Sequence, residues 1–282
     1  MSKQKKLCLV AAVGTVVTFL LRLLQQLTGF ENDTGLAVNG HPAGLAVVVL
    51  FAAAAVCAWV FSGSCEKENR ACRDVFSTES AAELTVLVMG LFLMAAGGVF
   101  QVMFGVMGGG LERVLYRGGM MGVVWMGNMS PVEVLVLGVC AAAPAVCLFP
   151  AAAACRRRED GEVRSFRSEL LLVPVVCMVV RLVLLYRMHS INPVLQAYYV
   201  ELLAVVFVTL AFYQLAGFAV EQGRLRWYSV CTNLAVLLCV TTLADGHDIS
   251  GMALYGGCAL TLAGFRLLYR EASPVEEVYP ED

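Results

Sequence analysis

Runs of about 20 apolar residues recur along the whole chain, and this feature decides what the chain can fold into. A helix of that length crosses the hydrocarbon core of a bilayer. Eight such runs lie near residues 7–28, 43–62, 82–105, 131–154, 169–187, 196–220, 228–244 and 251–269. A lone strand in lipid would leave backbone groups unpaired, and the alternating pattern of a barrel is absent, so each run predicts a helix.

The composition leaves little room for a soluble domain. Hydrophobic residues make up 59% of the 282 residues and charged residues 15%, which is more apolar surface than a soluble fold can cover. We therefore predict an all-α fold: a polytopic membrane helix bundle with about eight transmembrane helices over residues 1–270, followed by an acidic cytoplasmic tail at 271–282. The lipid bilayer is then its main partner.

The distribution of lysine and arginine predicts the orientation of the chain. With the N-terminus inside, fourteen of the 20 basic residues lie in the cytoplasmic loops and ends and three in the external loops. Such an excess is typical of the cytoplasmic side of a membrane protein. We expect both termini in the cytoplasm and the chain in a plasma (inner) membrane. The scattered positive charges and the net charge of −2 exclude nucleic acid as an expected partner.

The two halves of the chain resemble each other weakly. Arg22 in the first run and Arg181 in the fifth each lie in the outer third of the run, ahead of a short external loop. In each half the next apolar run ends at a cytoplasmic loop that begins with Glu66 or Glu221. Because four crossings return the chain to the same side, the halves would form a four-plus-four parallel repeat.

Residues 105–128 form the one long external connection that we expect. This stretch contains the glycines 108–110, a short amphipathic segment at 111–117 and an apolar patch with Trp125. An interfacial helix anchored by Trp125 is the simpler interpretation, and a re-entrant lid over a pore is the alternative.

The two arginines within the runs are the most informative residues for function. An arginine inside a span is unfavourable by a few kcal/mol, so it normally faces the protein interior or a wet cavity and has a partner. Arg22 shares a helix face with Gln25 and Gln26, which makes a polar stripe. Glu201 is the expected partner of Arg181, because it lies too deep in its helix to be a capping residue. We predict these five residues as a substrate-binding site.

All three histidines lie on the predicted outer side. His41, His189 and His247 are accompanied there by acidic residues, of which Asp245 and Asp248 flank His247. Imidazole and carboxylate together suit a transition-metal site. However, no pair has the close or helical spacing of a metal motif, and residues 245–248 equally suit a polar turn. The metal and any cofactor are therefore left open.

These residues favour one function and leave two alternatives. Our hypothesis is transport or binding of a small anionic or zwitterionic solute. The arginines could instead form ion pairs between helices in a non-catalytic scaffold or sensor subunit, whose protein partner is unknown. A membrane-embedded metal-dependent enzyme is the second alternative, although the sequence contains no nucleophile elbow, HExxH helix or phosphate-binding glycine loop.

Overall fold

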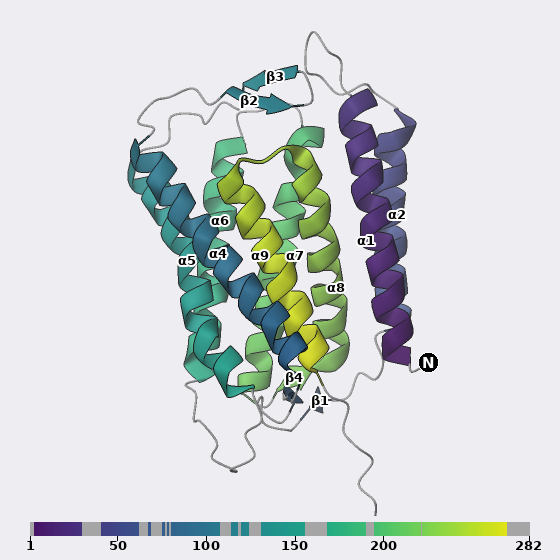
Figure 1. Ribbon diagram of the computed structural model, residues 1–282. Coiled ribbons are helices and arrows are strands. Elements are labelled where there is room, and N and C mark those ends of the chain that lie inside the picture. The colour runs from purple at the N-terminus through teal and green to yellow at the C-terminus, as the bar shows by residue number, and fades with distance from the viewer. Residues whose placement is uncertain are drawn as a thin grey trace, which may run out of the picture.

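The computed structural model describes residues 3–29, 41–61, 67–68, 75–76, 78, 80–107, 114–117, 120–123, 131–155, 168–189, 195–220 and 222–269. Within these ranges, eight helices are long enough and apolar enough to cross a membrane. They are α1 (Lys3–Thr28), α2 (Pro42–Phe61), α4 (Ala81–Met107), α5 (Pro131–Ala154), α6 (Leu172–His189), α7 (Leu195–Ala219), α8 (Leu225–Thr242) and α9 (Ile249–Leu268). The predicted all-α, multi-pass membrane bundle is confirmed (Figure 1).

Helices α4 to α9 form a bundle, and α1 and α2 form a helical hairpin at its side (Figure 1). The most extensive packing is between α4 and α9 and between α4 and α5. The hairpin of α1 and α2 contacts the bundle through α8 and through the short 3-10 helix η2 (Leu243–Asp245), whereas a second 3-10 helix, η1 (Ser168–Leu171), precedes α6. The four-plus-four repeat stays a prediction.

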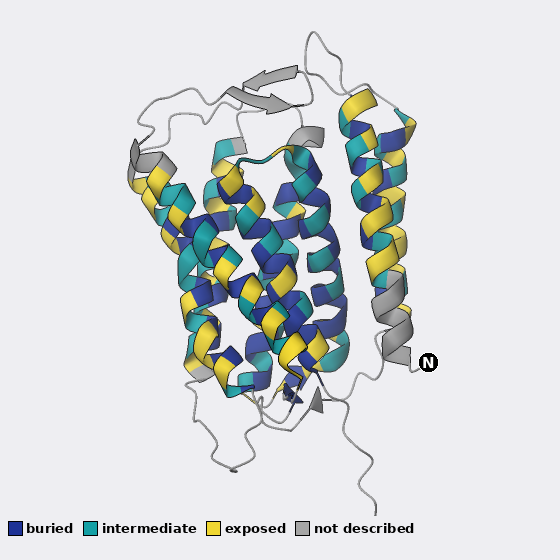
Figure 2. Ribbon diagram, in the orientation of Figure 1, coloured by how far each residue is buried: buried dark blue, intermediate teal, exposed yellow. Residues whose placement is uncertain are grey.

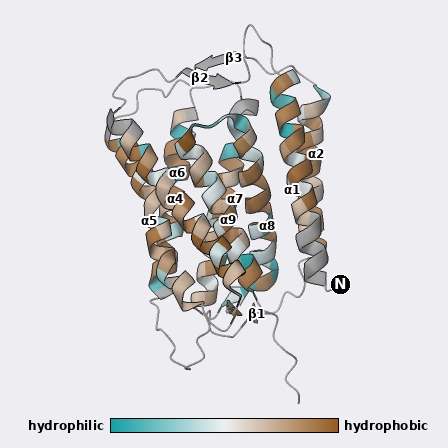
Figure 3. Ribbon diagram, in the orientation of Figure 1, coloured by the Kyte–Doolittle hydropathy of each residue, from teal (hydrophilic) through white to brown (hydrophobic). Residues whose placement is uncertain are grey.

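The outward faces of the helices are apolar, as a membrane environment requires. Large exposed side chains on these faces include Val13 of α1, Leu45 of α2 and Val176 of α6. Exposed positions in Figure 2 coincide with strongly apolar stretches in Figure 3. So large an apolar surface would drive aggregation in water, whereas it is stable against lipid.

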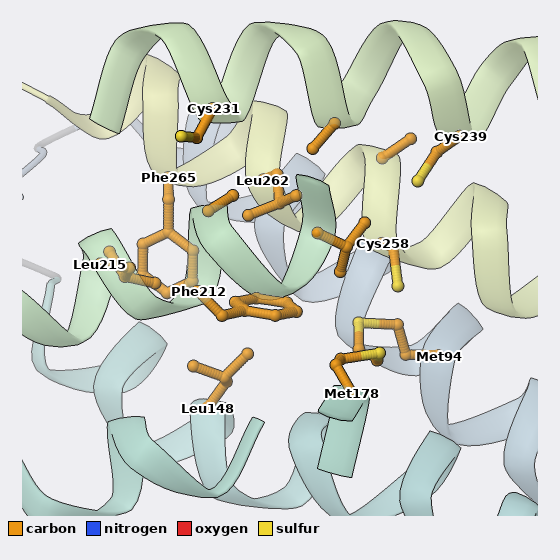
Figure 4. Packing of buried hydrophobic residues seen from close by; sticks show 14 of the residues in the cluster. Met94, Leu148, Met178, Phe212, Leu215, Cys231, Cys239, Cys258, Leu262 and Phe265 are labelled. Carbon is orange, nitrogen blue, oxygen red and sulfur yellow. The ribbon is translucent and has the colours of Figure 1, made fainter. Parts of the chain in front are cut away.

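The core lies where the helices of the main bundle meet. Figure 4 shows its central side chains pointing toward one another. Six of the helices contribute buried residues to this cluster, among them Met94, Leu148, Met178, Phe212, Cys239 and Leu262.

The crossing of α4 and α9 depends on glycines that let the two backbones touch. A Cβ atom built on Gly90 would lie 2.5 Å from the backbone nitrogen of Thr261, and one on Gly264 would lie 2.8 Å from the Cα of Leu87. Small residues allow such close approach between membrane helices. These contacts hold α4 and α9 in one register.

Replacing Gly257 with alanine is expected to lower the free energy of unfolding by about 1–3 kcal/mol, the usual effect of overpacking. The new Cβ would lie 2.5 Å from the backbone nitrogen of Met94. Gly256→Ala is the matched control, because its Cβ would meet only the tip of Leu93 at 3.4 Å. Equilibrium unfolding in detergent checks both variants, and an equal loss in the two would contradict the close crossing.

Two short strand pairs connect helix ends. Strand β1 (Lys67–Glu68) pairs with β4 (Gly223–Arg224), and β2 (Val114–Arg117) pairs with β3 (Met120–Val123). The interfacial helix expected within residues 105–128 is therefore wrong for residues 114–117 and 120–123, which form these strands. Gly118 and Gly119 separate these strands in the sequence, and such a glycine pair is typical of a two-residue hairpin connection. Trp125 and the acidic tail at 271–282 lie outside the described residues.

The connection between α2 and α4 reaches into one end of the bundle. Phe76 is fully buried there and makes edge-to-face contacts with Phe218, Tyr228 and Phe265. Two residues after Phe76, the backbone nitrogen of Thr78 donates to the backbone carbonyl oxygen of Cys155, which directly follows α5, at 3.0 Å. We call this end of the bundle the Phe76 end, and the opposite end, at which η2 lies, the Asp245 end.

Candidate functional site

Polar side chains gather at the Asp245 end, where α1, α4 and α6 finish and α7 and α9 begin. In the membrane interior such residues are rare and normally face other protein groups. The set, which we call the polar cluster, comprises Arg22, Gln25, Gln26, Gln101, Arg181, Tyr199, Glu201, Asp245, His247 and Tyr255. It therefore draws on most of the helices and on the turn between α8 and α9.

Arg22 is completely buried and forms an ion pair with Asp245. Its Nε lies 2.6 Å from Asp245 Oδ1, and its Nη1 donates to Gln25 Oε1 at 2.9 Å. Gln26 Nε2 donates to the same Asp245 oxygen at 2.7 Å. The polar stripe predicted on α1 is thus a network that fixes α1 to η2, and its positive charge is balanced directly.

The turn between α8 and α9 places Asp245 against α1. Gly246 follows it with a φ of 71°, a left-handed conformation that side chains other than glycine adopt with strain. Asp248 then caps α9, because its Oδ1 accepts from the backbone nitrogen of Gly251 at 3.0 Å. The residues considered as metal ligands therefore form a helix-linking turn in which Asp245 and Asp248 have separate partners.

Arg181 of α6 is buried in a different way. Its side chain is 5% exposed, and its Nη1 donates to the neutral amide of Gln101 at 3.1 Å. Its Cζ lies 5.8 Å from the centre of the Tyr255 ring. Among the described residues no carboxylate lies within ion-pair distance of Arg181, and its Nε has no hydrogen-bond partner.

Glu201 contacts the same tyrosine. The hydroxyl of Tyr255 donates to Glu201 Oε1 at 2.6 Å, and the Glu201 side chain is 8% exposed. The ring of His247 packs against that of Tyr255, with 5.2 Å between the ring centres. The structure therefore brings Arg181 and Glu201 together around Tyr255.

Four buried polar atoms of the polar cluster have no hydrogen-bond partner within the described chain. They are Arg181 Nε, Tyr199 Oη, Asp245 Oδ2 and His247 Nε2. Arg22 Cζ lies 5.3 Å from the centre of the Tyr199 ring, which places this tyrosine beside the ion pair. Buried polar groups are normally satisfied, so each of these atoms calls for a partner such as water or a bound molecule. Together they offer donors and an acceptor to a small polar molecule.

The residues predicted as metal ligands do not converge in the part of the chain that the structure describes. No group of three or more His, Cys, Asp or Glu side chains there is placed to hold a metal ion. His41 lies at the start of α2, where its Nδ1 accepts from the backbone nitrogen of Ala43 at 3.3 Å. The side chain of His189 lies outside the described residues.

An apolar groove of about 340 Å³ lies between α4 and α5, away from the polar side chains. It is lined by small and aliphatic residues that include Gly98, Gly138 and Ala142. No residue of the polar cluster lines this groove.

The fold and the polar cluster define a multi-pass integral membrane protein of the helical-bundle class with a charged interior. Comparisons with protein-family models, curated proteins and solved structures return no match. The chemistry of the site therefore has to be argued from its own residues.

Proposed function

We propose that the protein binds a small anionic or zwitterionic solute at the polar cluster and passes it across the membrane. The observation that carries this proposal is Arg181, a buried guanidinium with a neutral hydrogen-bond partner and an unsatisfied Nε. A buried charge without a counter-charge is strongly unfavourable. A carboxylate or phosphate oxygen of a solute would supply both the missing charge and the missing acceptor.

The two arginines differ in a way that favours a binding site at Arg181. Arg22 is paired with Asp245 at 2.6 Å and has the arrangement of a structural ion pair. This pair alone would suit a scaffold or sensor subunit. Arg181 lacks such a pair among the described residues, which a purely structural role would not explain.

The balance of charges favours a zwitterion or a single negative charge over a multiply charged anion. The polar cluster contains two arginines and two carboxylates, Glu201 and Asp245. Beside the free donor of Arg181 it offers a free acceptor, Asp245 Oδ2, and the hydroxyl of Tyr199. A solute with one acidic and one basic or hydroxyl group complements this set.

The predicted orientation places the polar cluster in the outer half of a plasma membrane. With both termini in the cytoplasm, as the basic residues favour, the Asp245 end faces outward. Arg22, Arg181 and Glu201 are 0%, 5% and 8% exposed, so a solute enters only when helices move apart. Such movement is the basis of alternating access in membrane carriers.

Arg181→Gln is expected to abolish solute binding while the fold is retained. The test is a thermal-unfolding screen of the purified protein in detergent with lactate, inorganic phosphate, alanine and other small carboxylates and amino acids. A solute at about 100 times its dissociation constant stabilises the wild type by about 2.7 kcal/mol. In Arg181→Gln this stabilisation is expected to disappear, since the amide cannot balance a negative charge.

Arg187→Gln is the matched control for this test. Arg187 lies on the same helix, but its side chain is 72% exposed and pairs with Glu133 at 2.7 Å. This variant is expected to keep the full solute-induced stabilisation. Equal stabilisation of wild type and Arg181→Gln would contradict the assigned site, and no stabilisation by any solute would favour the scaffold.

A further inference from the structure

We propose that Arg266, with the hydroxyl groups of Ser229 and Thr232, binds the phosphate group of a membrane lipid at the Phe76 end of the bundle. This end lies opposite the polar cluster, so the lipid site is independent of the proposed solute binding. In the predicted orientation, the lipid belongs to the cytoplasmic leaflet.

Arg266 is a buried guanidinium in the last turn of α9. The residue is 9% exposed, and its Nε has no hydrogen-bond partner in the described chain. Among the described residues no carboxylate lies within ion-pair distance of it, and its Cζ lies 5.6 Å from the centre of the Tyr269 ring. A helix C-terminus carries a partial charge of only about −0.5, which balances part of the positive charge. The remainder calls for an anion.

Arg266 lies on the side of α9 that faces α8. Gly264, two residues earlier, faces α4, because a Cβ atom built on it would lie 2.8 Å from the Cα of Leu87. Two helical residues turn the side-chain direction by about 200°, so Arg266 points away from α4. The other long helix that packs extensively on α9 is α8, which lies next to it in Figure 1. The guanidinium therefore lies at the junction of α9 with α8.

Ser229 of α8 lies at nearly the same level of the bundle as Arg266. The residue before each of them contacts the ring of Phe76: Tyr228 at 5.7 Å and Phe265 at 6.0 Å between ring centres. Because α8 and α9 share this ring, the next residue of each helix lies within about one helical turn of the other along the bundle axis. A buried hydroxyl is thus placed at the level of the buried guanidinium.

Two hydroxyl groups in this part of α8 are buried without a partner in the described chain. They are Ser229 Oγ and Thr232 Oγ1, and both residues are 0% exposed. A hydroxyl in a membrane helix can donate to the backbone carbonyl four residues earlier, as Thr241 does to Leu237 at 2.8 Å. Ser229 and Thr232 are three residues apart and share one helix face. Together with Arg266 Nε they form a set of donors that lacks an acceptor.

A lipid phosphate suits these donors because the site lies beside the lipid-facing surface. Arg266 precedes the end of α9 at Leu268 by two residues, about 3 Å along the axis, and a long arginine side chain reaches the headgroup layer from there. Its neighbour Leu267 is 48% exposed, and Trp227, in the first turn of α8, is 43% exposed, as is typical of an interfacial aromatic residue. A guanidinium binds phosphate through two parallel N–H···O bonds, and hydroxyl groups can donate to the remaining oxygens.

Native mass spectrometry of the delipidated protein in a maltoside detergent tests the site. Phosphatidylglycerol is the probe, and a diacylglycerol with the same chains but no phosphate is the control lipid. Arg266→Gln is expected to weaken phosphatidylglycerol binding at least about tenfold, the effect of losing a hydrogen bond to a charged group. Diacylglycerol binding is expected to stay unchanged. Equal phosphatidylglycerol affinity in the wild type and Arg266→Gln would overturn the proposal.

Arg224→Gln is the matched control variant. It removes the same charge at the same end of the bundle, but from an exposed residue in β4, and is expected to keep the wild-type affinity. An equal loss in Arg224→Gln and Arg266→Gln would indicate general attraction between the protein and an anionic lipid. That result would overturn the assigned site.

Ser229→Ala and Thr232→Val keep the arginine and remove one donor each. Each variant is expected to weaken phosphatidylglycerol binding about fivefold, as for the loss of an ordinary hydrogen bond. Thermal unfolding checks the fold of all the variants, and these two test the site even where Arg266→Gln does not fold. Wild-type affinity in both would overturn the role of the α8 hydroxyl groups.

Inorganic phosphate distinguishes a lipid headgroup from the free ion. Arg181→Gln, which lacks the solute site, is compared with the double variant Arg181→Gln with Arg266→Gln in lipid-free detergent. Sodium phosphate is expected to leave the melting temperature of both unchanged. A stabilisation by phosphate that is present in Arg181→Gln and lost in the double variant would assign the site to free phosphate and overturn the lipid as its occupant.

Discussion

Replacing Arg22 with alanine is expected to lower the free energy of unfolding by about 3–5 kcal/mol. The side chain is fully buried, and its Nε lies 2.6 Å from Asp245 Oδ1. Its removal leaves the carboxylate of Asp245 in the bundle with the amide of Gln26 as its only donor among the described residues. Since α1 and α2 contact the other helices through α8 and η2, this hairpin is expected to separate first.

A double variant separates the loss of the ion pair from the loss of packing. In Arg22→Met with Asp245→Leu both charges are absent, so no buried carboxylate is left unpaired, and replacement by apolar residues of similar size is often neutral or stabilising. Equilibrium unfolding in detergent is expected to show a smaller loss for the double variant than for Arg22→Ala. A larger loss in the double variant would contradict the ion-pair account.

Replacing Phe76 with alanine is expected to destabilise the protein by about 3–5 kcal/mol, the usual effect of deleting a buried aromatic side chain. Phe76 lies within 5.3 to 6.2 Å of four aromatic ring centres, those of Phe218, Tyr228, Phe265 and Tyr269. Its removal would leave a cavity at the Phe76 end, where the ends of three helices meet. Solvent access there is expected to increase with the loss of stability.

Phe92→Ala is the matched control for Phe76→Ala. Phe92 lies on α4, is 63% exposed and contacts the exposed ring of Phe149. Its removal exposes little new surface, because lipid or detergent already surrounds it. Thermal unfolding of both variants is the measurement. Similar shifts in melting temperature would argue against close packing of the aromatic rings around Phe76.

The fold could be predicted because the lipid constrains each helix locally. Each apolar run had to become a helix, whatever its neighbours. The neighbours themselves could not be predicted, since the packing of α4 on α9 depends on backbone approach at Gly90 and Gly257. Glycines recur in most membrane helices, so the sequence alone does not distinguish a crossing point from an ordinary position.

The candidate site was predicted in part. Both arginines are buried, but the ion-pair partner of Arg22 is Asp245, 223 residues away, which we had considered as a metal ligand or a turn residue. Its position in η2, directly after α8 and at the same end of the bundle as the end of α1, was the available signal. Tyr255 was missed because a tyrosine in a span normally packs as a core residue, and only the fold shows that Arg181 and Glu201 meet at its ring.

Nuclear magnetic resonance of the arginine Nε–H groups tests the central claim most directly. The signals of Arg181 and Arg22 can be assigned from the spectra of Arg181→Gln and Arg22→Gln. On titration with a solute that stabilises the protein, the Arg181 Nε–H signal is expected to shift, because this donor gains an acceptor, while the Arg22 signal, already bonded to Asp245, stays in place. An Arg181 signal that does not move while the solute binds would contradict the account.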